Sequence, residues 1–327
     1  MNFSKLLFII MLILSTIISI SSKTWIGMWM GMEMNLMSFI PILAKSKNKK
    51  SSKSIMIYFL VQSISSVIML FFIMMSKLLI LTPFINEMII NSMIVISLFM
   101  KLGIAPFHLW LPTIADNLSW IESSLLLTWQ KIAPFYLLSM LNYNKLIFMS
   151  VILSAMIGAI GGLNCSSLMK IMAYSSINHM GWMLLMMIYQ MQWFKYLLLY
   201  SFIVIMPMWF FKFYNLYFIN QIYINLNSPL EKLTFSSMML SMGGLPPFLG
   251  FLPKWMVLQS AIFNIPMLMF LTMMSLLTLF FYMRMISSLL LFFSAINKFN
   301  YKMYYYNFNF LIITLTLFLP LISIFVF

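Results

Sequence analysis

Two stretches of the chain decide its fold: MKLGIAPFHLWLP at residues 100–112 and LSMGGLPPFLGFLPKW at residues 240–255. Each lies in an apolar run of about 30 residues, the first over about 88–118 and the second over about 233–263. Proline cannot donate a helical hydrogen bond, and glycine is conformationally free, so both residue types interrupt helices. The sequence therefore predicts two long helices that are broken in the middle.

The two breaks repeat each other. When they are aligned, five positions are identical and a sixth is aromatic in both: Gly103-x-x-Pro106-Phe107-x-x-Trp110-Leu111-Pro112 against Gly244-x-x-Pro247-Phe248-x-x-Phe251-Leu252-Pro253. The runs are five helices apart, so they would cross a membrane in opposite directions. An inverted repeat built on broken helices is typical of transporters, with the functional site at the breaks. The alternative is that glycine and proline merely kink two ordinary helices.

The composition requires a membrane. Only 7% of the residues are charged, against about 25% in soluble domains, and the mean hydropathy is +1.02. Eleven apolar runs approach the roughly 20 residues that a spanning helix needs, and backbone groups in lipid must pair within helices. The runs lie near 4–22, 25–44, 55–76, 88–118, 122–141, 146–165, 171–190, 196–217, 233–263, 266–293 and 307–326. We expect an all-α polytopic protein with about 11 transmembrane helices, forming one transmembrane domain over 1–327 with a core over about 23–290.

The net charge of +14 does not indicate nucleic-acid binding, because most basic residues fall in short gaps between apolar runs. With eleven crossings, eleven lysines lie on the side of the N-terminus and four on the other. Lysine marks the side that is not translocated, so we expect the N-terminus in the matrix and the C-terminus in the intermembrane space. The 37 Met, 32 Phe and single arginine indicate an organelle gene and the mitochondrial inner membrane.

Four ionisable residues fall within the predicted bilayer region: Glu33, Lys101, Lys131 and Lys254. A charge at a helix centre costs about 2.5–3.5 kcal/mol on insertion scales, so these residues indicate function unless they snorkel or form structural ion pairs. Arg284 is less central. Removal from water favours the neutral amine of lysine, and a nearby carboxylate favours the charged form. Each lysine is therefore a candidate proton carrier, and we expect Glu33 to pair with Lys101.

His108 and His179 lie in or beside predicted helices and are further candidates for proton transfer. Haem ligation by both is a weaker alternative. Polar residues near the lysines either hold water or bond helix to helix, and the sequence does not choose between these roles. They are Thr128, Gln130, Ser175, Ser176 and Asn178.

Known cofactor motifs are missing from the sequence. It holds neither GxxxxGK[ST] nor GxGxxG, and no carboxylate cluster suited to Mg²⁺. Its lone cysteine, Cys165, excludes a disulfide framework and a CxxC site. We therefore expect no cofactor-binding or metal site in this chain, and redox chemistry elsewhere.

Five motifs resemble one known family: GMEMNLMSFIP (31–41), MKLGIAPFHLWLP (100–112), LLLTWQKIAPF (125–135), LMKIMAYSSINHMGWM (168–183) and LSMGGLPPFLGFLPKW (240–255). They are similar to the subunit 2 family of mitochondrial NADH:ubiquinone oxidoreductase (complex I). This family belongs to the antiporter-like subunits, which are related to Mrp-type cation/proton antiporters. The resemblance covers roughly residues 1–290, and the tail after about Ser294 carries no family motif.

The resemblance implies a proton-translocating membrane-arm subunit of a respiratory-chain enzyme, with other complex I subunits and lipid as partners. It implies that Glu33 pairs with Lys101, that Lys131 passes the proton onward and that Lys254 is the exit-side group. NADH, FMN, iron–sulfur clusters and ubiquinone would be used by other subunits. Two alternatives remain: a stand-alone Mrp-type cation/proton antiporter, and a purely structural membrane subunit.

Overall fold

A computed structural model describes residues 3–44, 49–78, 87–141, 145–190, 192–226, 228–291 and 306–317. The chain divides into two compact units, Met1–Ser150 and Val151–Phe327. The described residues are helical almost throughout, with one isolated antiparallel bridge between Ser167 and Phe218. The prediction of an all-α fold is therefore confirmed.

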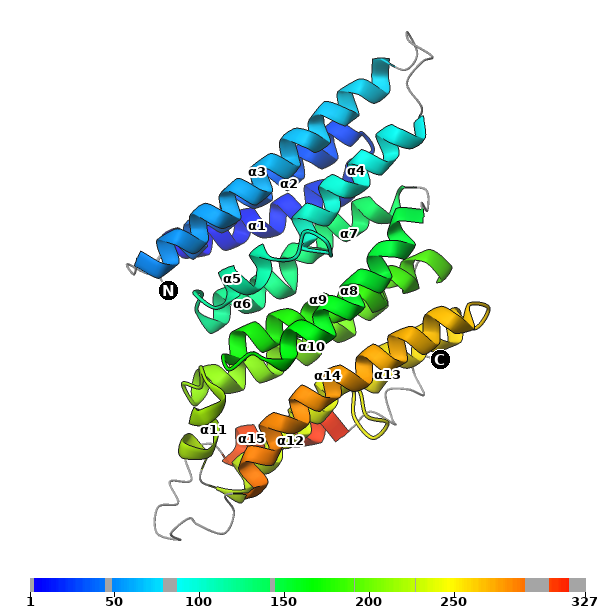
Figure 1. Cartoon of the computed structure of the whole chain (residues 1–327). Helices are drawn as coiled ribbons and strands as arrows, with labels where there is room; N and C mark the ends of the chain where they lie inside the picture. The colour runs from blue at the N-terminus through cyan, green and yellow to red at the C-terminus, as the bar shows by residue number, and fades with distance from the viewer. Residues whose placement is uncertain are drawn as a thin grey trace. The chain divides into compact units, whose positions relative to one another are not determined.

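The first unit holds the N-terminal helices, ending with the start of α8. Helices α1, α2 and α3 pack side by side, and α4 packs on α3 (Figure 1). Among the short helices that follow, α5 packs on α3 and α7 packs on α4. The bounds are α1 Phe3–Ser21, α2 Trp25–Leu43, α3 Lys49–Leu78, α4 Glu87–Leu102, α5 Trp110–Ala115, α6 Trp120–Leu127, η1 Trp129–Lys131, α7 Ile132–Ser139 and α8 Lys145–Leu163.

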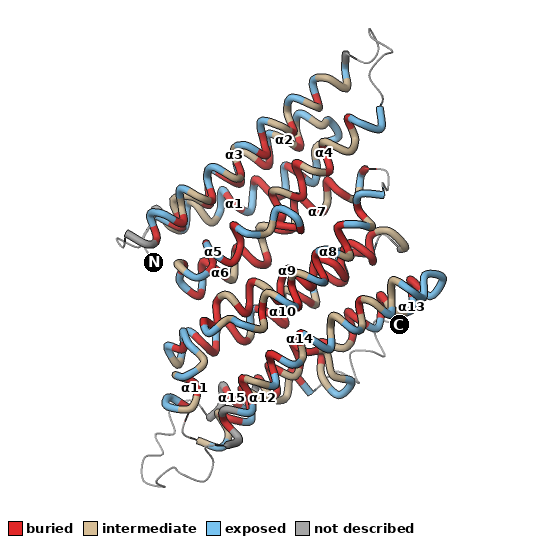
Figure 2. Tube along the Cα trace, viewed as in Figure 1, coloured by how far each residue is buried: buried red, intermediate tan, exposed pale blue. Residues whose placement is uncertain are grey.

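The second unit is organised around α9, which is buried along almost its whole length (Figure 2). Helices α10, α13 and α14 pack against α9, and α12 packs against α10, α14 and α15. The bounds are α9 Leu168–Gln190, α10 Trp193–Phe213, α11 Ile219–Asn225, α12 Pro229–Gly243, α13 Phe251–Ser260, α14 Ile265–Leu291 and α15 Tyr306–Leu317.

Local sequence signals explain where several helices begin. The Thr24 hydroxyl accepts a hydrogen bond from Gly27 N at 3.3 Å and caps α2. At α12, Ser228 and Glu231 form a reciprocal capping box, and Pro229 occupies the first helical position. These residues satisfy amide groups that the first turn of a helix leaves unpaired.

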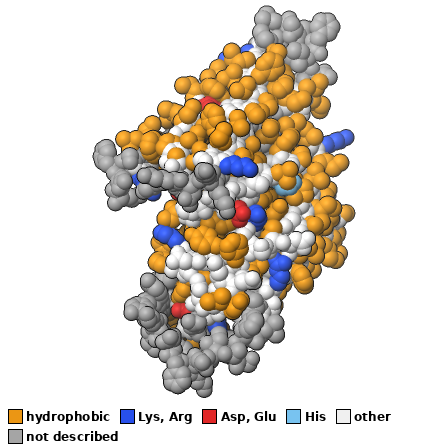
Figure 3. All heavy atoms as spheres, turned by 60° about the vertical axis from the view of Figure 1, so that its left-hand side comes forward, with side chains coloured by type: hydrophobic (Ala, Val, Ile, Leu, Met, Phe, Trp, Pro, Cys, Tyr) orange, Lys and Arg blue, Asp and Glu red, His pale blue; other side chains and the backbone are white. Residues whose placement is uncertain are grey.

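Five of the described helices are long and apolar enough to cross a membrane: Trp25–Leu43, Ser51–Lys77, Lys145–Leu163, Trp193–Phe213 and Ile265–Ser287. Hydrophobic side chains cover most of the described surface on the face in Figure 3, with charged groups scattered among them. Each of the eleven apolar runs overlaps one helix or a succession of short ones. The count of about eleven crossings stays a prediction.

Candidate functional site

The first break lies between α4 and α5. Helix α4 ends at Leu102, and Gly103 adopts a left-handed conformation with φ +69°, which favours glycine because it has no Cβ. Ile104 N then donates to Phe99 O at 3.1 Å, as in a Schellman cap. Lys101, in the last turn of α4, is 7% exposed.

Side chains bind the carbonyls that this helix end leaves free. Trp110 Nε1 donates to Met100 O, and Gln62 Nε2 from α3 donates to Lys101 O, both at 3.1 Å. Because buried carbonyls need partners, these two bonds hold the break in place. The Lys101 amine takes no part in them.

The second break, between α12 and α13, has a similar backbone, although the cis peptide bond Ala105-Pro106 belongs to the first break alone among the described residues. Gly244 has φ +75°, and its N–H donates to Leu240 O at 3.1 Å. Here the freed Gly243 carbonyl accepts a hydrogen bond from the Lys254 amine itself, at 2.6 Å. Lys254 is 5% exposed, so the first turn of α13 carries a buried amine back to the end of α12.

The likeness between the breaks extends to individual hydrogen bonds. The bonds Ile104 N to Phe99 O, Phe107 N to Ile104 O and Leu111 N to His108 O each have a counterpart at the aligned residues. The counterparts are Leu245 N to Leu240 O, Phe248 N to Leu245 O and Leu252 N to Leu249 O. The sequence repeat therefore encodes a repeated backbone.

The region around Lys131 differs from the expected continuous helix over 122–141. Helix α6 ends at Leu127, a 3₁₀ turn covers Trp129–Lys131, and α7 begins at Ile132. Pro134 explains this correction: it cannot donate to Gln130 O, and its ring crowds that carbonyl. Lys131 is 2% exposed. It is therefore a buried lysine at the end of a 3₁₀ turn between two α-helices.

A small cavity in the first unit joins the surroundings of Lys101 and Lys131. It offers about 20 Å³ to the centre of a water molecule, and about 10–15 Å³ is enough for one. Gln130 Nε2 donates to Asn35 Oδ1 at 3.0 Å on its wall. The full lining is Met32, Asn35, Leu36, Tyr58, Gln62, Lys101, Leu102, Trp110, Leu111, Leu126, Gln130, Lys131 and Pro134.

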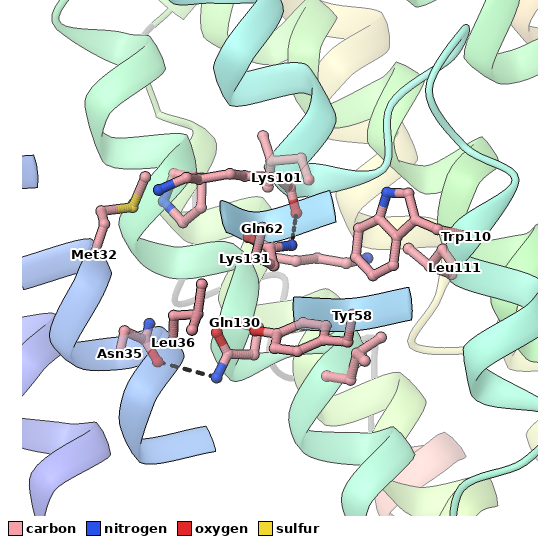
Figure 4. Close-up of a pocket in the computed structure, with 13 residues that line it drawn as sticks. Met32, Asn35, Leu36, Tyr58, Gln62, Lys101, Trp110, Leu111, Gln130 and Lys131 are labelled. Atoms are coloured by element: carbon pink, nitrogen blue, oxygen red, sulfur yellow. Dashed lines mark hydrogen bonds between the residues drawn. The ribbon is translucent and has the colours of Figure 1, made fainter. Parts of the chain in front are cut away.

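The two amines of the cavity extend in opposite directions. Figure 4 shows Lys101 reaching toward Met32 on α2 and Lys131 reaching toward Trp110. The neighbour of Met32 on α2 is Glu33. Buried Glu33 Oε1 has no hydrogen-bond partner. A close Glu33–Lys101 ion pair stays a prediction.

The two histidines occupy different surroundings. His108 lies in the first break, is half-buried, and contacts Pro106 O through Nδ1 at 3.1 Å. It does not line the cavity. His179 is buried on α9, and its Nδ1 lies 2.8 Å from the Tyr196 hydroxyl on α10.

Several polar residues around these sites were not expected from the sequence. In the first unit these are Asn35, Gln62 and Tyr58, which line the cavity. In the second unit, the buried tyrosines Tyr196, Tyr200 and Tyr282 lie close to His179, Ser176 and Ser175 respectively. A tyrosine in an apolar helix is normally predicted to be a core residue. The sequence therefore gives no signal for these tyrosines unless a hydroxyl is already expected beside His179 or a lysine.

Arg284 does not lie among the buried lysines; it connects two helices. Its guanidinium donates to Leu163 O through Nη1 and to Cys165 O through Nη2, the latter at 2.7 Å. It thus caps the end of α8 from α14. Within the ranges that the structure describes, no group of three or more His, Cys, Asp or Glu could hold a metal ion.

Comparison with known proteins identifies the family. The family described as NADH:quinone oxidoreductase/Mrp antiporter, TM, matches residues 22–281. The NADH-ubiquinone oxidoreductase chain 2 of Anopheles gambiae is 44% identical over 293 residues, covering 86% of this chain and 84% of the relative. The Locusta migratoria protein of the same name is 42% identical over 288 residues, with coverages of 86% and 84%.

Two solved structures share the fold. A chain of respiratory complex I from Thermus thermophilus with bound aureothin has a TM-score of 0.78 at 20% identity, covering 88% of this chain and 71% of its own length. A chain of the Mrp complex from Dietzia sp. has a TM-score of 0.75 at 16% identity, with coverages of 85% and 59%. The resemblance seen in the five motifs is thereby confirmed, and the chain belongs to the NADH-ubiquinone oxidoreductase chain 2 family of antiporter-like membrane subunits.

Proposed function

We propose that this chain is a proton-translocating membrane-arm subunit of an NADH:ubiquinone oxidoreductase in the mitochondrial inner membrane. Family membership supports this function, since the relatives at 42–44% identity carry the name of that enzyme's chain 2. The apolar helices agree with a multi-pass membrane protein. Its partners are the other membrane-arm subunits and lipid, and it does not act on nucleic acid.

The observation that carries the proposal is the position of three buried lysines. Lys101, Lys131 and Lys254 are 7%, 2% and 5% exposed; Lys101 and Lys254 lie in the helical turns beside the two breaks, and Lys131 ends a 3₁₀ turn. A lysine in an apolar helix is costly, and an irregular backbone at membrane depth is tolerated only where protein or a hydrated cavity surrounds it. A charge that can appear and disappear at such points is suited to carrying protons.

The residues have distinct roles in this mechanism. Glu33 controls the charge of Lys101 through its carboxylate, which acts on that amine. Lys131 shares with Lys101 a cavity that has room for a water molecule, and it passes the proton on. Lys254 is the exit-side group, His179 is a further carrier, and His108 is a weaker candidate because it does not line the cavity.

The driving energy comes from outside this chain. Electrons pass from NADH through FMN and iron–sulfur clusters to ubiquinone in other subunits, and this chain holds no redox centre of its own. We place the N-terminus in the matrix and the C-terminus in the intermembrane space, because lysines favour the N-terminal side. The codon-biased composition supports an organelle gene.

Replacing Lys131 by Met tests the function. The assembled complex is placed in sealed vesicles, and proton translocation is measured during NADH oxidation, per mole of complex. We expect Lys131→Met to slow translocation by roughly a hundredfold, the usual order for loss of an acid–base group. The matched control is Lys195→Met, which removes an exposed lysine on α10. A Lys131→Met complex that assembles and pumps like the control would leave a purely structural subunit.

A second function is favoured by the shared fold with the Mrp complex chain. A stand-alone cation/proton antiporter would exchange Na⁺ or K⁺ for H⁺ when this chain alone is reconstituted in vesicles. We expect no exchange from the isolated chain. Exchange that Lys131→Met abolishes would establish the antiporter instead.

A further inference from the structure

A buried set of hydroxyl groups in the second unit lies beyond the lysines and histidines discussed so far. It begins at His179 on α9, whose Nδ1 is 2.8 Å from Tyr196 OH on α10. Tyr200 follows Tyr196 by one helical turn, and its ring centroid is 5.1 Å from that of His179. His179, Tyr196 and Tyr200 are all buried. One histidine is therefore flanked by two phenols from the same neighbouring helix.

The set continues from Tyr200 to Tyr282 on α14. The Ser176 hydroxyl donates to Ala173 O at 2.7 Å, so its oxygen is free to accept the hydrogen bond of the Tyr200 phenol. Tyr282 lies near Tyr200, on α14, which packs against α9. Ser175, the neighbour of Ser176 on α9, lies near Tyr282.

Tyr282 in turn reaches the second break. A Cβ built on Gly243 would lie 3.8 Å from Tyr282 Cδ2, so the tyrosine ring flanks the residue whose carbonyl binds Lys254. The Tyr282 hydroxyl is buried and has no hydrogen-bond partner among the described residues. A buried hydroxyl without a partner is destabilising, so it is expected to persist only where a water molecule or a movable amine can bind it.

We propose that Tyr196, Tyr200 and Tyr282, the tyrosine thread, relay protons between His179 and Lys254. The proposal rests on the proposed function, because it supplies a route to the exit-side lysine. In the direction of exit, His179 gives up an N–H proton, each hydroxyl forms an O–H bond with the arriving proton while its original O–H bond breaks toward the next acceptor, and a neutral Lys254 amine forms an N–H bond with the last proton. No hydroxyl gains or loses charge overall, and rotation of the O–H groups resets the thread.

The choice of tyrosine over phenylalanine supports a role for the hydroxyls. The chain uses 32 phenylalanines, and several are fully buried, including Phe210, Phe235 and Phe281. Phe281 and Tyr282 are adjacent on α14, and only the second places a hydroxyl inside the unit without a partner. Packing alone would be served equally well by a phenyl ring, without the cost of removing a hydroxyl from water.

Single Tyr→Phe changes test the thread, because they remove one oxygen and keep the ring. The probes are Tyr282→Phe and Tyr200→Phe in the assembled complex, with NADH-driven proton translocation measured per mole of complex. The matched control is Tyr189→Phe, which removes another buried hydroxyl without a hydrogen-bond partner. Tyr189 lies ten residues beyond His179 on α9, about 15 Å along the helix.

We expect each thread variant to slow translocation at least tenfold and to increase its solvent deuterium isotope effect, while Tyr189→Phe matches the wild type. A change that only loosened packing would not increase the isotope effect. Because the groups act in series, the double variant His179→Ala, Tyr282→Phe should be no slower than His179→Ala alone.

The thread is overturned if Tyr282→Phe and Tyr200→Phe both translocate protons at the wild-type rate. If Lys131→Met is defective at the same time, the proposed function is supported and only the tyrosine thread is contradicted. Wild-type rates in all three variants overturn both. Should Tyr282→Phe fail to assemble, Tyr200→Phe decides alone, because its hydroxyl lies on a different helix.

Discussion

The two breaks share a left-handed glycine and a pattern of backbone hydrogen bonds, but different side chains bind their freed carbonyls. At the first break, neutral groups from Gln62 and Trp110 bind the freed carbonyls, and the Lys101 amine extends elsewhere. At the second break, the Lys254 amine is itself the group that binds the Gly243 carbonyl. A helix end attracts positive charge, so the charge of Lys254 is tied to the geometry of its break.

Replacing the aligned glycines by alanine should produce the largest difference in proton translocation between the two breaks. Alanine at Gly103 or Gly244 forces a left-handed conformation that costs about 1–2 kcal/mol. At Gly244 the new Cβ would also lie 2.8 Å from Lys254 Nζ, whereas at Gly103 it would meet Leu111 Cδ1 at 3.0 Å. The flexible amine must move, and it loses its hydrogen bond to Gly243 O.

We therefore expect Gly244→Ala to reduce proton translocation per mole of assembled complex about tenfold more than Gly103→Ala. The difference corresponds to a charged hydrogen bond of about 1.5–3 kcal/mol. The quantity to measure is the translocation rate in sealed vesicles, normalised to complex content. Equal losses in the two variants would show that only backbone strain matters and that the Lys254 bond does not.

Replacing each lysine by methionine should destabilise the second break more than the first. Lys254→Met leaves the buried Gly243 carbonyl without its partner, at a cost of about 1–3 kcal/mol, whereas Lys101→Met leaves both side-chain bonds of the first break intact. Hydrogen exchange of the Gly244 and Leu245 amides should accelerate in the first variant. Exchange at Ile104 should not change in the second, and faster exchange there would mean that Lys101 also holds its break.

Trp110→Phe should have the smallest effect. It keeps an aromatic ring, as Phe251 does at the aligned position, but removes the N–H that binds Met100 O. We expect a loss of about 1 kcal/mol, seen as faster exchange of the Ile104 amide with proton translocation unchanged. A loss of translocation would instead assign the indole a role beside Lys131, which extends toward it.

Much of this architecture could be predicted because glycine and proline carry conformational information directly. The aligned Gly103 and Gly244 patterns predicted both breaks, and both glycines have positive φ. The 3₁₀ turn at Lys131 was missed, although Pro134 was a signal for it. The bond from Lys254 to Gly243 could not be predicted, because it requires the chain to fold back by eleven residues. The tyrosine thread depends on three helices packing together, which no local pattern specifies.

The placement of Arg284 has a further consequence for how the molecule uses charge. Arginine keeps its proton at any physiological pH, so a guanidinium can fasten α14 to the end of α8 permanently. An amine at that position would be able to release its proton and with it the attachment. The chain thus places its one arginine where two helices are joined, and under the proposed function it leaves the exchange of protons to lysines, whose amines can lose their charge.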